Sequence, residues 1–191
     1  DEVRSLLDLD GIDINYSDKH GCTPLYRSTS LYVASHNGHI DVVKALIAAG
    51  GNVNQAETTY GASPLYIASH DDHVAIVKVL IKAGANVNQA TTDNGSSPLF
   101  IASLMENVEV VKVLIQAGGN VNQARTTDGM SPLFVASENG DIDTAKVLID
   151  AGANVNQAQT TTGTTPFYIA CHNVDYSHHD MVRLLNQHDA N

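Results

Sequence analysis

One phrase returns along the chain at a fixed spacing, and this feature constrains the fold more than any other. Four glycines open the phrase at intervals of 34 residues, and residues 61–94 and 95–128 are identical at 21 of 34 positions. A unit of this length cannot bury its own apolar face, but stacked copies can bury theirs against their neighbours. We therefore expect one elongated domain of stacked units. The four glycines are Gly61, Gly95, Gly129 and Gly163.

Each copy predicts two short helices and a loop. Ser63 stands before Pro64, and a hydroxyl followed by proline is typical of a helix start. A second helix is predicted over 74–81, where apolar residues recur on one side, and Gly84 is expected to end it. The polar run that leads to the next copy indicates a turn or hairpin.

These phrases resemble the ankyrin repeat. The resemblance is carried by Ser/Thr-Pro-Leu-x-x-Ala, by a Val-Lys-x-Leu-Ile type of helix and by Gly-Ala-Asn-Val-Asn, in several copies that cover essentially the whole chain. It implies an all-α solenoid of stacked helix–turn–helix units with projecting hairpin fingers. It also implies that a partner protein binds the concave surface formed by the fingers and the first helices.

The resemblance places a single ankyrin-repeat domain over residues 1–191. A partial N-terminal repeat is expected first, then four full repeats and a more polar capping repeat, as a solvent-facing terminal unit requires. Because the chain starts inside a repeat and without Met, we expect a fragment of a longer protein. The expected bounds are 1–20 for the partial repeat, 21–60, 61–94, 95–128 and 129–162 for the full repeats, and 163–191 for the cap.

Two departures from the family pattern stand out. The family usually has His after Thr-Pro-Leu, whereas this chain has an aromatic residue, so we expect aromatic packing in place of a polar bond. The spacing from Gly21 to Gly61 is 40 residues, six more than the other spacings. The extra residues either lengthen the first helix by nearly two turns or bulge before it, as a contact loop or a tolerated insertion. The aromatic residues are Tyr26, Tyr66, Phe100, Phe134 and Tyr168.

Charge and cysteine content limit the classes of partner. The net charge is −11 and the pI is near 5.0, which disfavours nucleic acid and anionic membranes, because binding to phosphates depends on Lys and Arg. A partner protein with a basic surface is favoured instead. Cys22 and Cys171 lie near opposite ends of the chain, so a disulfide between them is not expected. We expect a monomer in a reducing, intracellular compartment, the cytoplasm.

No pattern for catalysis is found, so we expect neither an enzyme nor a cofactor. Four residues near the C-terminal end could ligate zinc, but a solvated polar loop explains them equally well and is favoured. The histidines near the turn between helices are expected to be structural. The last Asn of each Asn-Val-Asn phrase is expected to bond backbone at the base of a finger, although the family's Asn can also be hydroxylated. These sets are His172, His178, His179 and Asp180 for zinc; His36, His39, His70 and His73 for the turns; and Asn54, Asn88, Asn122 and Asn156 for the fingers.

Partner contacts are expected where the copies differ, because stacking explains what they share. Leu104 and Met105 stand out, since other copies carry polar residues there. Together with Arg125 and Met130 they predict an apolar and cationic spot in a polar groove, a composition enriched at the centres of interfaces. Neutral variation on a solvated surface is the open alternative. The full set of expected partner-binding residues is Tyr60, His70, Asp71, Asn94, Leu104, Met105, Arg125, Asp128, Met130 and Glu138.

Two functions remain open on the sequence alone. The first is a protein–protein interaction scaffold. The second is a regulatory or structural segment of a larger enzyme, channel or effector, which would contact its own neighbouring domains.

Overall fold

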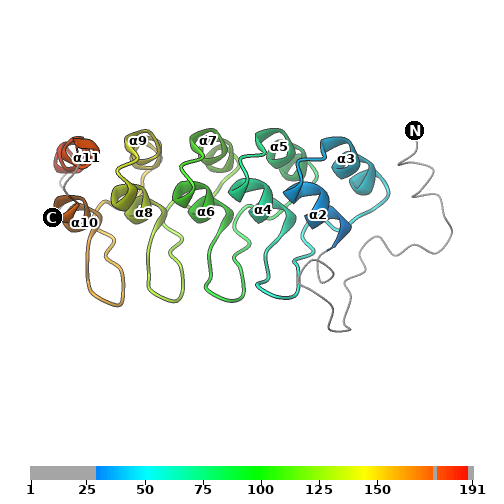
Figure 1. Ribbon diagram of the computed structural model, residues 1–191, viewed down its shortest axis with the longest axis horizontal. Helices are drawn as coiled ribbons and strands as arrows, with labels where there is room; N and C mark the ends of the chain where they lie inside the picture. The colour runs from blue at the N-terminus through cyan, green and yellow to red at the C-terminus, as the bar shows by residue number, and fades with distance from the viewer. Residues whose placement is uncertain (1–28, 174–175, 189–191) are drawn as a thin grey trace.

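The computed structural model describes residues 29–173 and 176–188, and these residues form ten helices and no strand. The helices lie in two rows, with loops that project from one row on the side away from the other (Figure 1). The inner row, from which the loops project, is α2 (Ser30–His36), α4 (Pro64–His70), α6 (Pro98–Leu104), α8 (Pro132–Asn139) and α10 (Pro166–His172). The outer row is α3 (Ile40–Ala48), α5 (Val74–Lys82), α7 (Val108–Gln116), α9 (Ile142–Asp150) and α11 (Tyr176–Asn186).

Every inner helix begins at a hydroxyl residue, and these residues are 34 positions apart. Each hydroxyl accepts the backbone N–H three residues further on, which satisfies one of the donors that a helix start leaves open. The expected helix start at Ser63 and Pro64 is confirmed. The five capping residues are Thr29, Ser63, Ser97, Ser131 and Thr165.

This register corrects two expectations about the first described repeat. Helix α2 has seven residues, as α4 has, so the six extra residues do not lengthen it. From Thr29 onward the spacing is regular, and the insertion falls among residues that the structure does not describe. The residue that matches Tyr66 in this register is Tyr32, which is 34 positions earlier, and not Tyr26.

The main core lies between the two rows of helices. In α2, α4, α6 and α8, a leucine and an alanine face apolar residues of the outer helix, and these side chains are almost fully buried; in α10 a partly buried Phe167 takes the place of the leucine. Burial of one such aliphatic side chain contributes about 1.5–3 kcal/mol, so the stacked layers supply most of the stability. In the repeat that holds α4 and α5, the core residues are Leu65, Ala68, Ile76, Val77 and Leu80.

A second, smaller apolar cluster lies on the finger side of the inner helices. Phe100, Phe134 and Val135 are fully buried there, and Leu104, Met130 and Ile169 pack against them. Phe100 and Phe134 stand where the family usually has His. The expected aromatic packing is therefore confirmed at these two positions.

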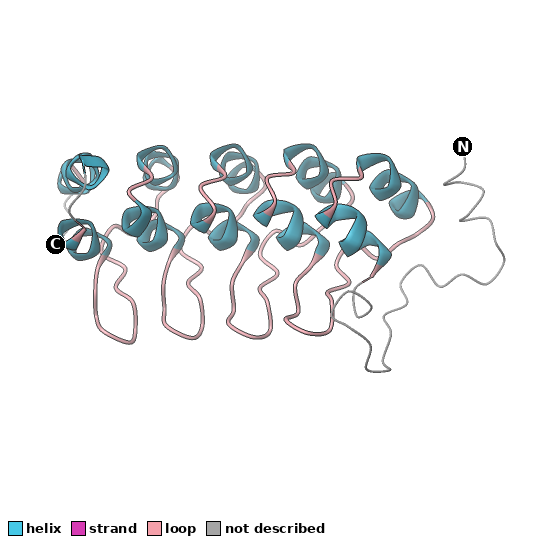
Figure 2. Cartoon of the chain, viewed as in Figure 1, coloured by secondary structure: helices cyan, strands magenta, loops and turns pink. Residues whose placement is uncertain are grey.

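The fingers are loops (Figure 2). Backbone hydrogen bonds close them and align them with one another. In each tip the first residue donates to the carbonyl of the last, as Thr91 does to Ser96 at 3.0 Å. Neighbouring fingers are also joined, because Thr92 and Thr126 donate to the carbonyls of Tyr60 and Asn94 at 2.8 Å. The tips are residues 57–62, 91–96, 125–130 and 159–164.

Side-chain amides hold the bases of the fingers together. Asn88 donates to the carbonyl of Gly118 and accepts from the backbone N–H of Asn120, both in the next repeat. Asn54 and Asn122 make the same pair of bonds one repeat before and after. The structural role expected for these three residues is confirmed.

The last described repeat ends the stack with a longer and more polar helix. Helix α11 has eleven residues, whereas the other outer helices have nine. Met181 and Leu185 are fully buried against the stack, whereas Asn186 and Gln187 are exposed. The partial repeat expected over 1–20 and Cys22 lie outside the described residues.

Candidate partner-binding face

The ten residues expected to bind a partner all lie in the finger tips or toward the C-terminal ends of inner helices. We call the surface formed by the finger tips and the inner helices the finger face. In Figure 1 it is the side of the molecule opposite the outer row. The structure thus brings the expected residues onto one face, although several of them are engaged in holding that face together.

In four of the five inner helices of the described chain, a carbonyl at or next to the C-terminal end accepts a hydrogen bond from a side chain of the next repeat. A helix end leaves its final carbonyls without partners in the helix, so an amide or imidazole N–H that reaches them stabilises both units. The carbonyls of His36, His70, Leu104 and Glu138 accept from His73 at 3.0 Å, Asn107 at 2.9 Å, Asn139 at 3.0 Å and Asn173 at 2.8 Å, respectively.

The capping side chains come from two different positions in the repeat. Asp141 explains why the cap moves from one position to the other. His73 and Asn107 lie just before an outer helix, and Asp141 is the next residue in that series. A carboxylate cannot donate, so Asp141 instead accepts the N–H of Thr144 and caps its own helix α9. Asn139, two residues earlier, then supplies the cap for Leu104.

This exchange leaves Asp71 and Met105 without a capping role. Both occupy the position that Asn139 and Asn173 use for capping, 34 residues apart along the chain. Because His73 and Asn107 already cap the neighbouring carbonyls, neither Asp71 nor Met105 is needed for that bond. Met105 is 43% exposed, which is unusual for a large apolar side chain in this molecule.

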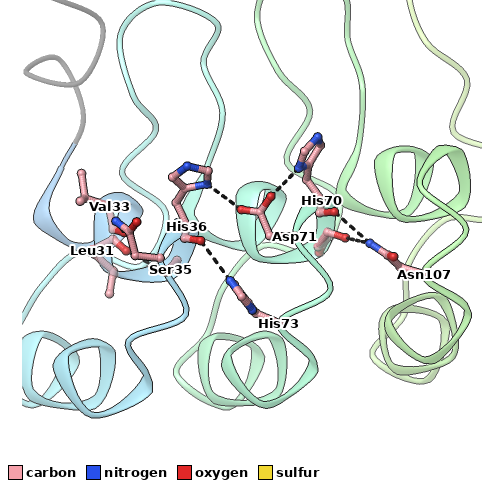
Figure 3. Close-up of polar contacts among 10 residues, drawn as sticks. Leu31, Val33, Ser35, His36, His70, Asp71, His73 and Asn107 are labelled. Carbon is pink, nitrogen blue, oxygen red and sulfur yellow. Dashed lines mark hydrogen bonds and ion pairs between the residues drawn. The ribbon is translucent and has the colours of Figure 1, made fainter.

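Asp71 lies between two imidazoles that come from two different repeats. His36 donates from Nδ1 to Oδ2 of Asp71 at 2.7 Å, and His70 donates from Nδ1 to Oδ1 at 2.6 Å. Figure 3 shows both rings directed away from the outer helices, whereas His73 and Asn107 lie on the other side of the inner helices. His36 and His73 therefore join neighbouring repeats, whereas the ring of His70 bonds to Asp71 within its own repeat. All three make structural contacts, as expected for them.

Two tyrosine hydroxyls report the electrostatic environment beside this cluster. Burial, together with the negative charges of Glu57 and Asp71, raises the pKa of Tyr32 to about 12. Burial and the charge of Asp93 raise the pKa of Tyr66, although Arg125 acts in the opposite direction. The N-terminal half of the finger face is therefore electronegative.

The first described finger tip is built around the buried carboxylate of Glu57. Its oxygens accept the backbone N–H groups of Thr59 at 2.6 Å, Tyr60 at 2.5 Å and Ala62 at 3.2 Å. Glu57 is 5% exposed, so its charge is used inside the finger. Tyr60, by contrast, is 57% exposed at the same tip.

The next two tips are also closed by their own side chains. In one, Asn94 accepts from Thr91 and from the backbone of Ser96. In the other, Arg125 forms a bidentate ion pair with Asp128, and both side chains are less than a quarter exposed. Asn94, Arg125 and Asp128 thus hold their fingers in shape.

The expected apolar and cationic spot is changed by this ion pair. The guanidinium of Arg125 lies 5.2 Å from the ring centre of Phe100 and 3.2 Å from the sulfur of Met130, and Asp128 neutralises its charge. Hydrogen bonding to Asp128 raises the pKa of Arg125 and lowers that of Asp128. Leu104 and Met130 are partly buried in the second cluster, so Met105 is the exposed apolar side chain of the spot.

Charges are unevenly divided between the two faces of the described chain. All the Lys and Arg residues in the ranges 29–173 and 176–188 lie on outer helices, except Arg125. The finger face carries five acidic residues against this single, paired Arg125, whereas the outer helices carry six basic and five acidic residues. The acidic residues of the finger face are Glu57, Asp71, Asp93, Asp128 and Glu138; the basic residues of the outer helices are Lys44, Lys78, Lys82, Lys112, Lys146 and Arg183, and their acidic residues are Asp41, Glu109, Asp143, Asp150 and Asp180.

Two of the histidines considered for zinc, His172 and His178, make other contacts in the fold. Among the described residues, no group of three or more His, Cys, Asp and Glu side chains is arranged to hold a metal ion. His178 is 5% exposed and donates to the carbonyl of Glu138 at 2.9 Å, so it is not the solvated residue that was expected. His172 stacks on Tyr168, and Asp180 pairs with Arg183 at 3.5 Å.

Sequence reasoning missed the link between His36 and Asp71 and the pair of tyrosines beside it. These side chains come from neighbouring copies, and no rule of sequence spacing pairs them. The available signal was the 34-residue register, which aligns Tyr32 with Tyr66 once Thr29 is taken as the helix start. None of the helices in the described ranges is both long and apolar enough to cross a membrane.

Paired helices in two rows, with aligned fingers on one side, define a helical repeat solenoid. A family model described as ankyrin repeats (3 copies) matches residues 31–125, 88–159 and 117–191. The chain therefore belongs to the ankyrin-repeat family. No curated protein matches the chain.

Proposed function

We propose that the chain is a protein–protein interaction module that binds a partner protein through its finger face. One observation carries this proposal. The large apolar side chains that are exposed among the described residues are Tyr60, Met105 and Tyr168, and all three lie on fingers or inner helices. Exposed aromatic and Met side chains are enriched where proteins bind one another.

We propose Met105 as the centre of the interface. Its neighbour Leu104 packs against the second apolar cluster, and the exposed Tyr60 lies in the finger before the one that leads into α6. A thioether on a rigid, packed support adapts to a partner surface at little cost. Glu138 and the finger residues Asn94 and Asp128 would form the polar rim around this centre.

The partner is proposed to present a basic surface, because the acidic residues of the finger face are not balanced by free cations there. Complementary charge raises the rate of association and selects partners. We further propose that the chain acts as a monomer inside the cell, where its two cysteines stay reduced. Light scattering at micromolar concentration measures the oligomeric state directly.

Affinity capture with matched variants tests the proposed interface. The chain is immobilised, proteins from a lysate of the source organism are captured, and the captured protein is then titrated against the variants. Four variants of the finger face are compared with two controls on the outer helices. The finger-face variants are Met105→Ala, Leu104→Ala, Arg125→Ala and Met130→Ala, and the controls are Lys78→Ala and Lys112→Ala. The proposal expects weaker binding with Met105→Ala and unchanged binding with the two outer-helix controls. Loss of binding only with the outer-helix variants would place the interface elsewhere.

A further inference from the structure

We propose that the finger face recognises a pair of partner side chains, a Lys or Arg received at Asp71 and an apolar side chain received at Met105. This inference rests on the proposed function, since it concerns the same face. It adds the chemistry of the two contacts and their separation. The partner segment it describes is cationic at the end near α4 and apolar at the end near α6.

First, capping of the preceding repeat does not explain these two residues. Asn139 and Asn173 fill the same position and are needed to cap carbonyls of the preceding repeat. In the repeats of Asp71 and Met105 that task is done by His73 and Asn107. Asp71 and Met105 directly follow adjacent inner helices and are not needed for this bond, so their exposed atoms are available to a partner.

The second step concerns the charge of Asp71. Its two oxygens are oriented by the imidazoles of His36 and His70, one from each of two repeats. Apart from Arg125, no Lys or Arg within the described ranges lies on the finger face, and Arg125 is held by Asp128. Asp71 is therefore a fixed carboxylate, 18% exposed at its side chain, with no Lys or Arg of the described chain paired to it.

The surroundings of Asp71 favour a cation. The hydroxyl of Tyr32 feels the charges of both Glu57 and Asp71. A partner ammonium or guanidinium placed there would meet this field and would make charge-assisted hydrogen bonds, which are stronger than neutral ones. A partner carboxylate at the same place would be repelled.

The third step concerns Met105, which provides the apolar contact. Its neighbour Leu104 packs on Phe100 and Phe134, which are fully buried, so the chain beneath Met105 is rigid. An apolar partner side chain that covers Met105 removes exposed thioether and methyl surface from water. Such burial is favourable in proportion to the apolar area.

The separation of the two contacts follows from helix packing. Asp71 and Met105 occupy the same position on α4 and α6, which are adjacent in the inner row (Figure 1). Axes of packed helices lie about 8–10 Å apart. A partner helix matches this distance with residues seven apart, which are about 10.5 Å apart, and a polyproline II segment matches it with residues three apart, about 9.3 Å.

A random peptide library displayed on phage tests the inference with the chain itself as bait. The result expected is enrichment of peptides that carry Lys or Arg three or seven positions from an apolar residue. Synthetic copies of the enriched peptides should lose affinity about tenfold or more with Asp71→Asn, because one charge-assisted bond is removed. They should also weaken with Met105→Ser. The control Asp143→Asn removes the same charge from the exposed surface of α9 and should change nothing.

Reversing the charge at Asp71 and on the peptide together distinguishes a lost contact from a misfolded variant. Peptides in which Glu replaces the basic residue should bind Asp71→Lys better than they bind the unaltered chain, while circular dichroism confirms the helix content. Peptides without a basic residue, unchanged affinity with Asp71→Asn, or no enrichment would each overturn the inference. If affinity depends on Met105 and Tyr60 but not on Asp71, the proposed face stands and only its cationic contact fails. If none of these variants weakens binding, the proposed face fails as well.

Discussion

At the scale of single residues, two side chains occupy a backbone conformation that suits glycine. The turn between inner and outer helix has Gly38 and Gly140 at φ +73°, and the same position in the intervening repeats holds Asp72 at +57° and Glu106 at +60°. The left-handed region costs a residue with a Cβ roughly 1–2 kcal/mol. Asp tolerates it better than Glu, because a short polar side chain can bond locally. Glu106 therefore carries the larger strain.

Replacement of Glu106 by glycine should stabilise the protein. The relief of strain exceeds the extra freedom that glycine gains in the unfolded chain, so we expect a gain of about 0.5–1 kcal/mol. Urea denaturation followed by circular dichroism measures the free energy of unfolding. Glu106→Ala, which keeps the Cβ, is the control and should bring little of this gain; a loss of stability with Glu106→Gly would contradict the account.

Tyr32 makes a prediction about alkaline pH. Its pKa is raised to about 12 in the folded chain, so folding favours the neutral hydroxyl. The stability linked to this shift is complete below the unfolded pKa of about 10 and is lost as pH rises toward the folded value. Between pH 9 and 11, the protein should lose more stability than the Tyr32→Phe variant does. Equal losses in urea titrations at these two pH values would show that Tyr32 is not the group responsible.

At the scale of elements, the caps that join one repeat to the next depend on the residue just before each outer helix, which is His73, Asn107 or Asp141 in successive repeats. Asn139 donates to the carbonyl of Leu104 because Asp141, at the position of Asn107, cannot donate. The two positions can thus exchange roles. The hydrogen bond between α8 and the end of α6 can therefore be removed at one position and restored from the other.

Asn139→Ala should destabilise the protein by about 1–2 kcal/mol, because it leaves a half-buried carbonyl without its partner. Adding Asp141→Asn should restore part of that loss, since an amide at this position repeats the geometry by which Asn107 caps His70. Thermal and urea unfolding of the single and double variants measure both effects. The explanation would be wrong if the second change lowered stability further.

The elements show what a sequence of this kind can reveal. Helix starts, the two-row arrangement and the apolar layers were predictable, because Ser-Pro signals and apolar spacing act within one copy. The cap from Asn107 to His70 and the bond from His36 to Asp71 join different copies, so no spacing within a copy announces them. Arg125 and Asp128 are only three residues apart in the sequence. Even so, the sequence does not predict that the Arg125 side chain pairs with Asp128, because Met130 and Phe100 are also within its reach.

At the scale of the whole molecule, the fingers must stay aligned for a continuous face to exist. Gly95 has φ +75°, and a Cβ at this residue would approach the side chain of Thr126 in the next finger to 2.5 Å. Gly84 has φ +90°, but a Cβ there would meet nothing within 4 Å. A comparison of alanine variants at these two glycines therefore distinguishes the free-energy cost of backbone strain from the cost of displacing a neighbouring finger.

Gly95→Ala should destabilise the protein more than Gly84→Ala. Backbone strain alone costs roughly 1–2 kcal/mol in both variants, and the contact with Thr126 adds to it only in the first. Differential scanning calorimetry on both variants gives the comparison. Loss of stability that is equal in the two would mean that finger alignment contributes nothing beyond local conformation.

The whole molecule also divides its chemistry between two faces. Exposed apolar side chains and unbalanced acidic charge lie on the finger face, and the lysines of the described chain lie on the outer helices. Stacking requires neither distribution. The division supports the proposed binding of a cationic partner at the finger face.

Photocrosslinking from two matched positions tests this account most directly. A benzoylphenylalanine placed at Met105, on the finger face, is compared with one at Lys112, on outer helix α7, whose side chain is similarly exposed. Each protein is irradiated with the captured partner, and the crosslinked product is measured by mass spectrometry. The account predicts a crosslink from position 105 and little or none from position 112; a crosslink from position 112 alone would contradict it.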